Sequence, residues 1–101
     1  MRIFRFITTI ISSILMTSCI INPNKISIAY PNWAEGIAVT HLAREILVEQ
    51  GFQVELLNAD VAPIFASVSR RKADVFMDAW LPVTMKDYMD QYGDQIEFIG
   101  E

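Results

Sequence analysis

The sequence has 101 residues and a formal net charge of −4, and this length suits one small domain or part of a larger protein. Its 52% hydrophobic content is raised by an unusual N-terminus. Without Arg2 and Arg5, six basic side chains face twelve acidic ones, a formal charge of −6. That balance argues against nucleic acid as a partner, because its phosphates would be repelled. It suits a small cationic or zwitterionic ligand, although an acidic surface is also simply a soluble one.

The first 21 residues carry two arginines near the start and no other charge. An apolar stretch follows the arginines and ends in small residues at 17–19, which is the arrangement of a secretory signal. An uncleaved membrane helix is the alternative, but a span needs roughly 20 predominantly apolar residues. This stretch is shorter and is diluted by serine and threonine, so we predict a signal peptide over residues 1–18.

Cys19 is the only cysteine, so no internal disulfide can form. A buried thiol is one interpretation of a lone cysteine. The run Leu15-Met16-Thr17-Ser18-Cys19 instead resembles the lipobox of bacterial lipoproteins, in which the cysteine is lipidated and becomes the first mature residue. A diacylated, N-acylated cysteine holds a protein at a membrane surface without spanning it. We therefore predict lipidation at Cys19, a tether over residues 19–24, and an extracytoplasmic location at a bacterial membrane, in the periplasm or at the cell surface.

Beyond the tether, the pattern predicts strands that alternate with helices. Residues 25–30 alternate in period two and indicate a strand. A helix is predicted over residues 33–50, with Asn32 as N-cap and Glu35 as the partner in a capping box. Gly51 stands where a left-handed residue would end this helix. The apolar stripe of the helix consists of Val39, Leu42, Ala43, Ile46 and Leu47.

The second half of the chain continues this alternation. The remaining predicted elements are, in chain order, a strand over residues 52–57, a helix capped by Asp60, a strand over residues 73–77, a short helix opened by a capping box of Thr84 and Asp87 and closed by Gly93, and a last strand over residues 96–99. This order favours an α/β fold with a largely parallel sheet flanked by helices.

Both tryptophans follow predicted strands. Trp33 lies just beyond the first strand and Trp80 just beyond the third. Ligands of open parallel sheets gather at the carboxyl ends of the strands. Two separate strand exits therefore deliver an indole to the same edge of the sheet.

The sequence offers little for catalysis. His41 is the only histidine, and Glu45 lies four residues later on the same helix face. A catalytic zinc site needs three protein ligands, so this pair is better explained as a solvated helix pair. No nucleophile elbow surrounds a serine, and no glycine-rich phosphate loop is present. We expect no enzyme activity, no metal and no cofactor.

A binding site is better supported. Aromatic faces attract cations, tryptophan most strongly, and this suits quaternary ammonium groups because they have no N–H to donate. The predicted helix start offers free backbone N–H groups at Gly36 and Ile37, which favour a carboxylate. Together with Trp33, these amides are suited to the two ends of a betaine. The alternative is that Trp33 and Trp80 are packing residues and that the capping box satisfies the helix start.

Four stretches of the sequence carry a family resemblance. KISIAYPNWAEGIAVTHLA, LNADVAPIFASV, RKADVFMDAWLPVTMKDY and YGDQIEFIG together resemble the N-terminal part of the glycine betaine/quaternary ammonium substrate-binding proteins of ABC transporters. The resemblance covers essentially all of residues 25–100. It implies a lobe of the periplasmic-binding-protein-like (type 2) fold, one of two lobes that close on the ligand. It also implies an ABC permease and its ATPase as partners.

The resemblance also implies which residues bind the ligand. Trp80 in DAWLP matches a tryptophan of the family's aromatic box, and Trp33 matches another that some members use, particularly choline binders. Glu35 falls where an acidic residue contacts the cation in some members, and Tyr30 is a further candidate. The expected ligand is glycine betaine, choline or a related compound, held by aromatic faces at Trp33 and Trp80 and by the Gly36–Ile37 corner.

Two features depart from the family pattern. Members are well over twice this length, so residues 25–101 are expected to be the first lobe, with the chain ending before the second. Met85 stands where many members carry histidine. The alternatives to a transport role are a lipoprotein sensor or interaction module that uses a single lobe, and a non-functional fragment.

Overall fold

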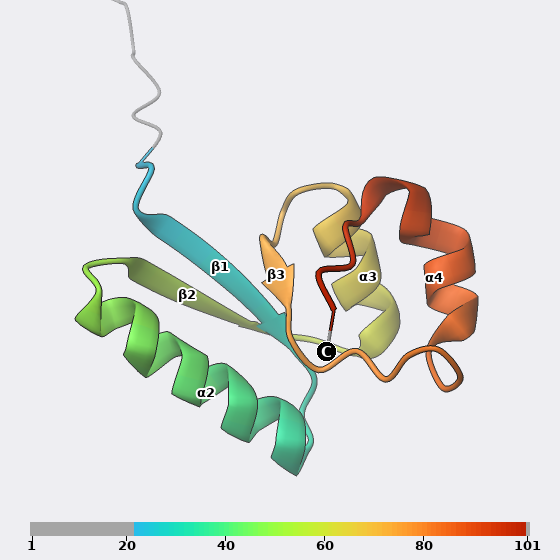
Figure 1. The fold of residues 1–101 in the computed structure, drawn as a ribbon, viewed down its shortest axis with the longest axis horizontal. Coiled ribbons are helices and arrows are strands. Elements are labelled where there is room, and N and C mark those ends of the chain that lie inside the picture. Colours follow the sequence, from blue (N-terminus) through green and yellow to red (C-terminus); the bar gives the residue numbers. More distant parts are fainter. Residues whose placement is uncertain (1–21, 101) are drawn as a thin grey trace, which may run out of the picture.

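Figure 1 shows the fold in a computed structural model that describes residues 22–100. The elements are β1 (Lys25–Tyr30), α2 (Ala34–Glu49), β2 (Gln53–Asn58), α3 (Val61–Ser69), β3 (Val75–Phe76), α4 (Lys86–Tyr92) and the 3-10 helix η2 (Gly93–Gln95). The predicted signal peptide and Cys19 lie outside the described residues. Among those that are described, no helix is long and apolar enough to cross a membrane.

The three strands form one parallel sheet in the order β2-β1-β3. The chain therefore moves from β1 to one side and then crosses back to the other. Right-handed crossovers in opposite directions place their helices on opposite faces of a sheet. Figure 1 shows this arrangement, with α2 on one side of the sheet and α3 and α4 on the other. The predicted α/β fold with a parallel sheet is confirmed.

The core lies between the central strand β1 and helix α3. Its buried cluster consists of Ala29 of β1, Ile64 of α3 and Ala73, none of which is more than 1% exposed. The Phe65 ring packs edge-on against Phe76 of β3, with 5.6 Å between ring centroids, and stacks on Tyr88 of α4 at 5.3 Å. One aromatic side chain of α3 thus fixes both β3 and α4. The central strand is covered on both faces, because its consecutive residues Ser27, Ile28 and Ala29 are all buried although its sequence alternates.

The sequence predicted how α2 ends correctly but how it begins incorrectly. Gly51 has a φ of +95°, and the amides of Gly51 and Phe52 bond to the carbonyls of Val48 and Leu47. This is a Schellman ending, as predicted. The predicted capping box at the other end is wrong. The N-cap is Trp33 in an extended conformation, and no side chain caps the helix.

The C-terminal part of the described chain departs most from the prediction. The third strand is limited to Val75–Phe76, and residues 96–100 form no strand. The second capping box is also absent, because α4 begins after Met85 and has no side-chain cap. Gly93 does end α4, but in a right-handed conformation that leads into η2. These motifs are local, whereas the path of this segment is set by its packing on α3.

The apolar stripe of α2 is covered only in part. Val39, Ala43 and Leu47 are partly buried, while Leu42 and Ile46 are 62% and 49% exposed. The buried positions of the helix are Gly36 and Thr40. The surface by which the helix packs on the sheet is therefore narrower than its apolar stripe predicts.

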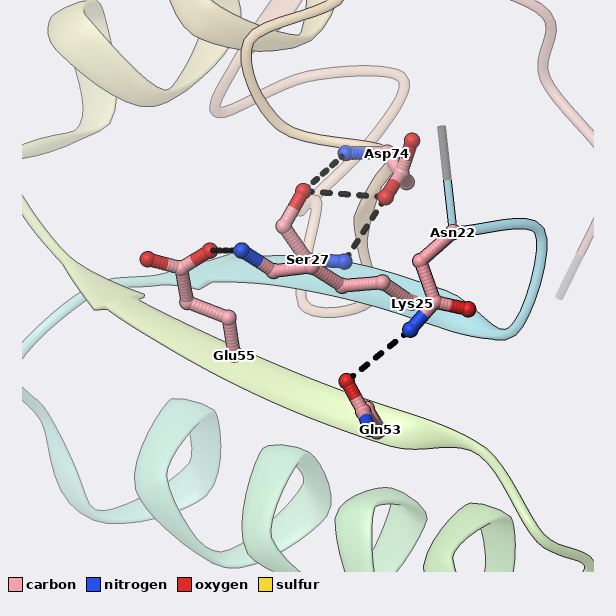
Figure 2. Close-up of polar contacts among 6 residues, drawn as sticks. All are labelled: Asn22, Lys25, Ser27, Gln53, Glu55 and Asp74. Carbon is pink, nitrogen blue, oxygen red and sulfur yellow. Dashed lines mark hydrogen bonds and ion pairs between the residues drawn. The ribbon is translucent and has the colours of Figure 1, made fainter. Parts of the chain in front are cut away.

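A polar contact joins β1 to the segment before β3 (Figure 2). Both the backbone N–H and the hydroxyl of Ser27 donate to Oδ2 of Asp74, at 2.7 and 2.9 Å. In return the backbone N–H of Asp74 donates to the Ser27 carbonyl at 2.9 Å. The same nitrogen lies 3.1 Å from Ser27 Oγ. Only two residue pairs join β1 to β3 by strand pairing. The Ser27–Asp74 contact therefore supplies much of the polar connection between these strands.

Figure 2 also shows two contacts between the start of β1 and β2. Lys25 Nζ lies 2.9 Å from Glu55 Oε2, and the Asn22 amide donates to Gln53 Oε1 at 3.1 Å. Both contacts are exposed to solvent. Exposed ion pairs contribute about 0.2–1 kcal/mol, so they add little to the six residue pairs that join β1 and β2.

We expect Asp74→Ala to lower the free energy of unfolding by about 1–3 kcal/mol, because it leaves the donors of buried Ser27 without their acceptor. Glu55→Ala is the matched control, since it removes a carboxylate from an exposed pair on the same sheet and should cost at most about 1 kcal/mol. Urea unfolding followed by circular dichroism measures both. Equal losses in the two variants would contradict the role given to Asp74.

Candidate ligand-binding site

The carboxyl ends of β1 and β3 lie side by side and lead into the two tryptophans. Strand pairing aligns Ala29 with Phe76, so both strands leave the sheet at the same edge. After β1, fully buried Pro31 directs the chain into Trp33, the N-cap of α2. Beyond β3, the chain reaches Trp80 without forming further regular structure. The predicted meeting of the two indoles at this edge agrees with the structure.

An open cavity of about 540 Å³ lies at this edge. Its lining residues are Trp33, Ala34, Glu35, Trp80, Thr84 and Met85. The two indoles are 36% and 50% exposed, respectively, which is unusual for side chains of this size. Three of the predicted ligand-binding residues, Trp33, Trp80 and Glu35, therefore share one cavity.

Both indoles are held by one carboxylate that the sequence analysis did not identify. Trp80 Nε1 donates to Oδ1 of Asp78 at 3.0 Å, and Trp33 Nε1 donates to Oδ2 of the same residue. Asp78 is partly buried at the exit of β3. The sequence did contain a signal for this role of Asp78. It lies two residues before Trp80, at the sheet edge where Trp33 was also expected. A buried or half-buried indole N–H requires an acceptor nearby.

The loop that carries Trp80 is closed by Met85. The Met85 amide donates to the Trp80 carbonyl at 3.0 Å, and the Trp80 amide lies 3.3 Å from the Met85 sulfur. Met85 is only 4% exposed, so its side chain also anchors the loop in the interior. The methionine that departs from the family pattern therefore supports the backbone of Trp80 and forms part of the cavity wall.

The start of α2 supplies backbone donors next to the cavity. The sequence predicted a free N–H group at Ile37, but this group donates to the Trp33 carbonyl at 2.9 Å. In the described part of the chain, the amides of Ala34, Glu35 and Gly36 have no backbone or side-chain acceptor. The donors available to an anion are thus displaced toward the beginning of the helix relative to the prediction.

Gly36 is required by the close approach of the helix to Pro31. A Cβ at position 36 would lie 2.9 Å from Pro31 Cγ and 3.0 Å from its carbonyl oxygen. Gly36 itself is buried and is not part of the cavity wall. Its role in this structure is to let the first turn of α2 pack directly on the end of β1.

Glu35 is an exposed acid on the cavity wall. It makes no capping bond, so its carboxylate is not engaged with Asn32. The cation nearest the cavity in sequence, Lys86, pairs with Asp90 along α4. This hydrogen bond and the charge of Asp90 raise the pKa of Lys86 above its ordinary value.

Tyr30 and His41 lie apart from the cavity. Their rings meet edge to face with centroids 6.0 Å apart, and neither residue lines the cavity. Across residues 22–100, no group of three or more histidine, cysteine or acidic side chains is arranged to hold a metal.

Comparison with known proteins identifies the family of this chain. The sequence model described as the substrate binding domain of ABC-type glycine betaine transport system matches residues 24–100. The chain belongs to this family. Among curated proteins, it is similar to the glycine betaine/carnitine transport binding protein GbuC of Listeria monocytogenes, with 30% identity over 80 residues. Among solved structures, it is similar to lactococcal OpuAC in its closed-liganded conformation complexed with glycine betaine, with a TM-score of 0.75 and 30% identity.

The matches differ in how much of each chain they cover. The GbuC match spans 79% of this chain and 27% of the relative, and the OpuAC match spans 76% of this chain and 30% of that structure. The chain thus spans less than a third of the length of either protein. The likeness to OpuAC confirms the periplasmic-binding-protein-like fold inferred from the sequence.

We expect Gly36→Ala to lower the free energy of unfolding by about 1–3 kcal/mol, because the added methyl group collides with Pro31. Gly93→Ala is the matched control. Gly93 has a φ of −58°, and an added Cβ would meet only Met89 Cε at 3.5 Å. This control should be neutral or slightly stabilising in urea unfolding. A neutral Gly36→Ala would show that the helix start can shift away from Pro31.

Proposed function

We propose that this lobe binds a small quaternary ammonium compound, with glycine betaine as the first candidate, as part of an extracytoplasmic solute-binding component of an ABC importer. The observation that carries the proposal is the cavity bounded by Trp33, Trp80 and Glu35 at the carboxyl edge of the sheet. Family membership and the likeness to a structure complexed with glycine betaine support the same ligand class. The lobe acts by binding and presenting a solute, with no catalytic step.

The cationic end of the ligand is assigned to the two indoles. A trimethylammonium group has no N–H, so it is attracted by aromatic faces and by nearby negative charge. Trp33 and Trp80 supply the faces, and Glu35 and Asp78 supply two carboxylates close to them. Nothing in this set repels a cation.

The anionic end of a betaine is assigned to the start of α2. The free amides of Ala34 and Glu35, two residues of the cavity wall, point toward the helix N-terminus, where the dipole also favours an anion. Choline carries a hydroxyl in place of the carboxylate and would gain less from these donors. The exposed Glu35 carboxylate works in the opposite direction, because it repels a ligand carboxylate and attracts a cation.

The partners and location follow from the same proposal. An ABC permease and its ATPase receive the solute, and lipidation of Cys19 holds the protein at the outer face of a bacterial membrane. The tether over residues 19–24 then connects the lipid directly to β1. The family of substrate-binding domains supports the transport role, and the lipobox-like sequence before Cys19 supports the anchor.

We expect Trp80→Ala to weaken glycine betaine binding about two- to fivefold, because a cation–π contact at an exposed site contributes about 0.5–1 kcal/mol. Isothermal titration calorimetry with glycine betaine measures the loss. Phe98→Ala is the control, since Phe98 is an exposed aromatic residue outside the cavity wall and should leave the affinity unchanged. An unchanged affinity in Trp80→Ala would contradict the proposed site.

We expect Glu35→Gln to weaken choline binding and to leave glycine betaine binding unchanged or tighter. The substitution removes a carboxylate that attracts the ammonium group and repels the betaine carboxylate. The ratio of the two dissociation constants is therefore the informative quantity. A parallel loss for both ligands would show that Glu35 acts on the shape of the cavity and not through its charge.

A further inference from the structure

We infer that Asp78 is the positioning residue of the aromatic site, because its carboxylate holds both indoles in the orientation in which their faces are open to the cavity. The ligand part of this inference rests on the proposed function. The structural part rests on two hydrogen bonds to one side chain.

The two bonds join segments that are far apart in the sequence. Trp80 is two residues from Asp78, whereas Trp33 is 45 residues away. Each carboxylate oxygen accepts one indole N–H, with Oδ1 serving Trp80 and Oδ2 serving Trp33. Because both oxygens belong to one rigid planar group, the two rings are fixed relative to each other and to β3.

The position of the anchor on the rings matters for binding. The indole nitrogen is a donor at the ring edge, so a bond at this atom leaves both aromatic faces free. The exposed fractions of Trp33 and Trp80, 36% and 50%, indicate that packing alone covers much less than the whole of either ring. Without Asp78, both side chains would have to be ordered when the ligand binds, and this ordering weakens binding.

The charge of Asp78 adds to the effect of its geometry. A carboxylate beside each indole N–H places negative potential at the edge of both rings, and this favours a cation on their faces. The isosteric Asp78→Asn variant removes this charge and leaves a single acceptor oxygen for two donors. It can therefore satisfy only one of the two tryptophans at a time.

The test compares Asp78→Asn with the wild-type protein by nuclear magnetic resonance and calorimetry. The chain has only two tryptophans, so their indole N–H groups give two signals. We expect both wild-type signals to be shifted downfield and protected from exchange, and at least one of them to lose these properties in Asp78→Asn. Glycine betaine affinity should fall about threefold through the cost of ordering the released ring.

Glu49→Gln is the matched control for loss of one negative charge. Glu49 is the last residue of α2, at the opposite end of the helix from the cavity. It should leave the two indole signals and the affinity unchanged. An equal loss of affinity in Glu49→Gln would show that net charge, and not position, explains the effect of Asp78.

The remaining outcomes separate this inference from the proposed function. Indole signals that are unchanged in Asp78→Asn would overturn the inference, and so would an unchanged glycine betaine affinity. If Asp78→Asn does not fold, the wild-type spectrum decides, because two freely exchanging indole hydrogens would also overturn it. Failure of the wild-type protein to bind glycine betaine would overturn the proposed function, and the indole signals would still decide whether Asp78 holds both rings.

Discussion

The direct pairing of β1 with β3 is the constraint on which the site depends. The chain leaves β1 toward β2, returns across the sheet, and places β3 on the other side of β1. In open parallel sheets, ligands bind where the strand order reverses in this way. Here the pairing is short, and the Ser27–Asp74 contact reinforces it. The two indoles meet because the two strands that precede them are neighbours.

The parallel direction of the strands and the sheet edge at which the tryptophans lie were predictable from the sequence. The period of the apolar residues identifies β1 and α2, and Gly51 marks the end of α2. Trp33 and Trp80 follow separate strands, so a parallel sheet brings them to one edge. This prediction needs only the order of the elements. It does not depend on any particular side-chain contact, and it is correct.

The details of the site were less predictable, for two physical reasons. Asn32 and Glu35 match a capping box locally, but the packing of Gly36 on buried Pro31 sets where the helix begins. The role of Asp78 depends on a partner in a distant segment, and a single sequence does not show which acid will face an indole. Both results depend on tertiary packing, which overrides local preference.

The long separation between the contacting segments has a consequence for folding kinetics. Ser27 and Asp74 are 47 residues apart, and Trp33 and Asp78 are 45 apart. Contacts between residues so far apart in the sequence form late in folding, because the intervening chain must first be closed into a loop. Once the Ser27–Asp74 contact has closed that loop, the Trp33–Asp78 contact requires little further loss of chain entropy. The aromatic site is therefore expected to assemble in the same kinetic step as the sheet edge that supports it.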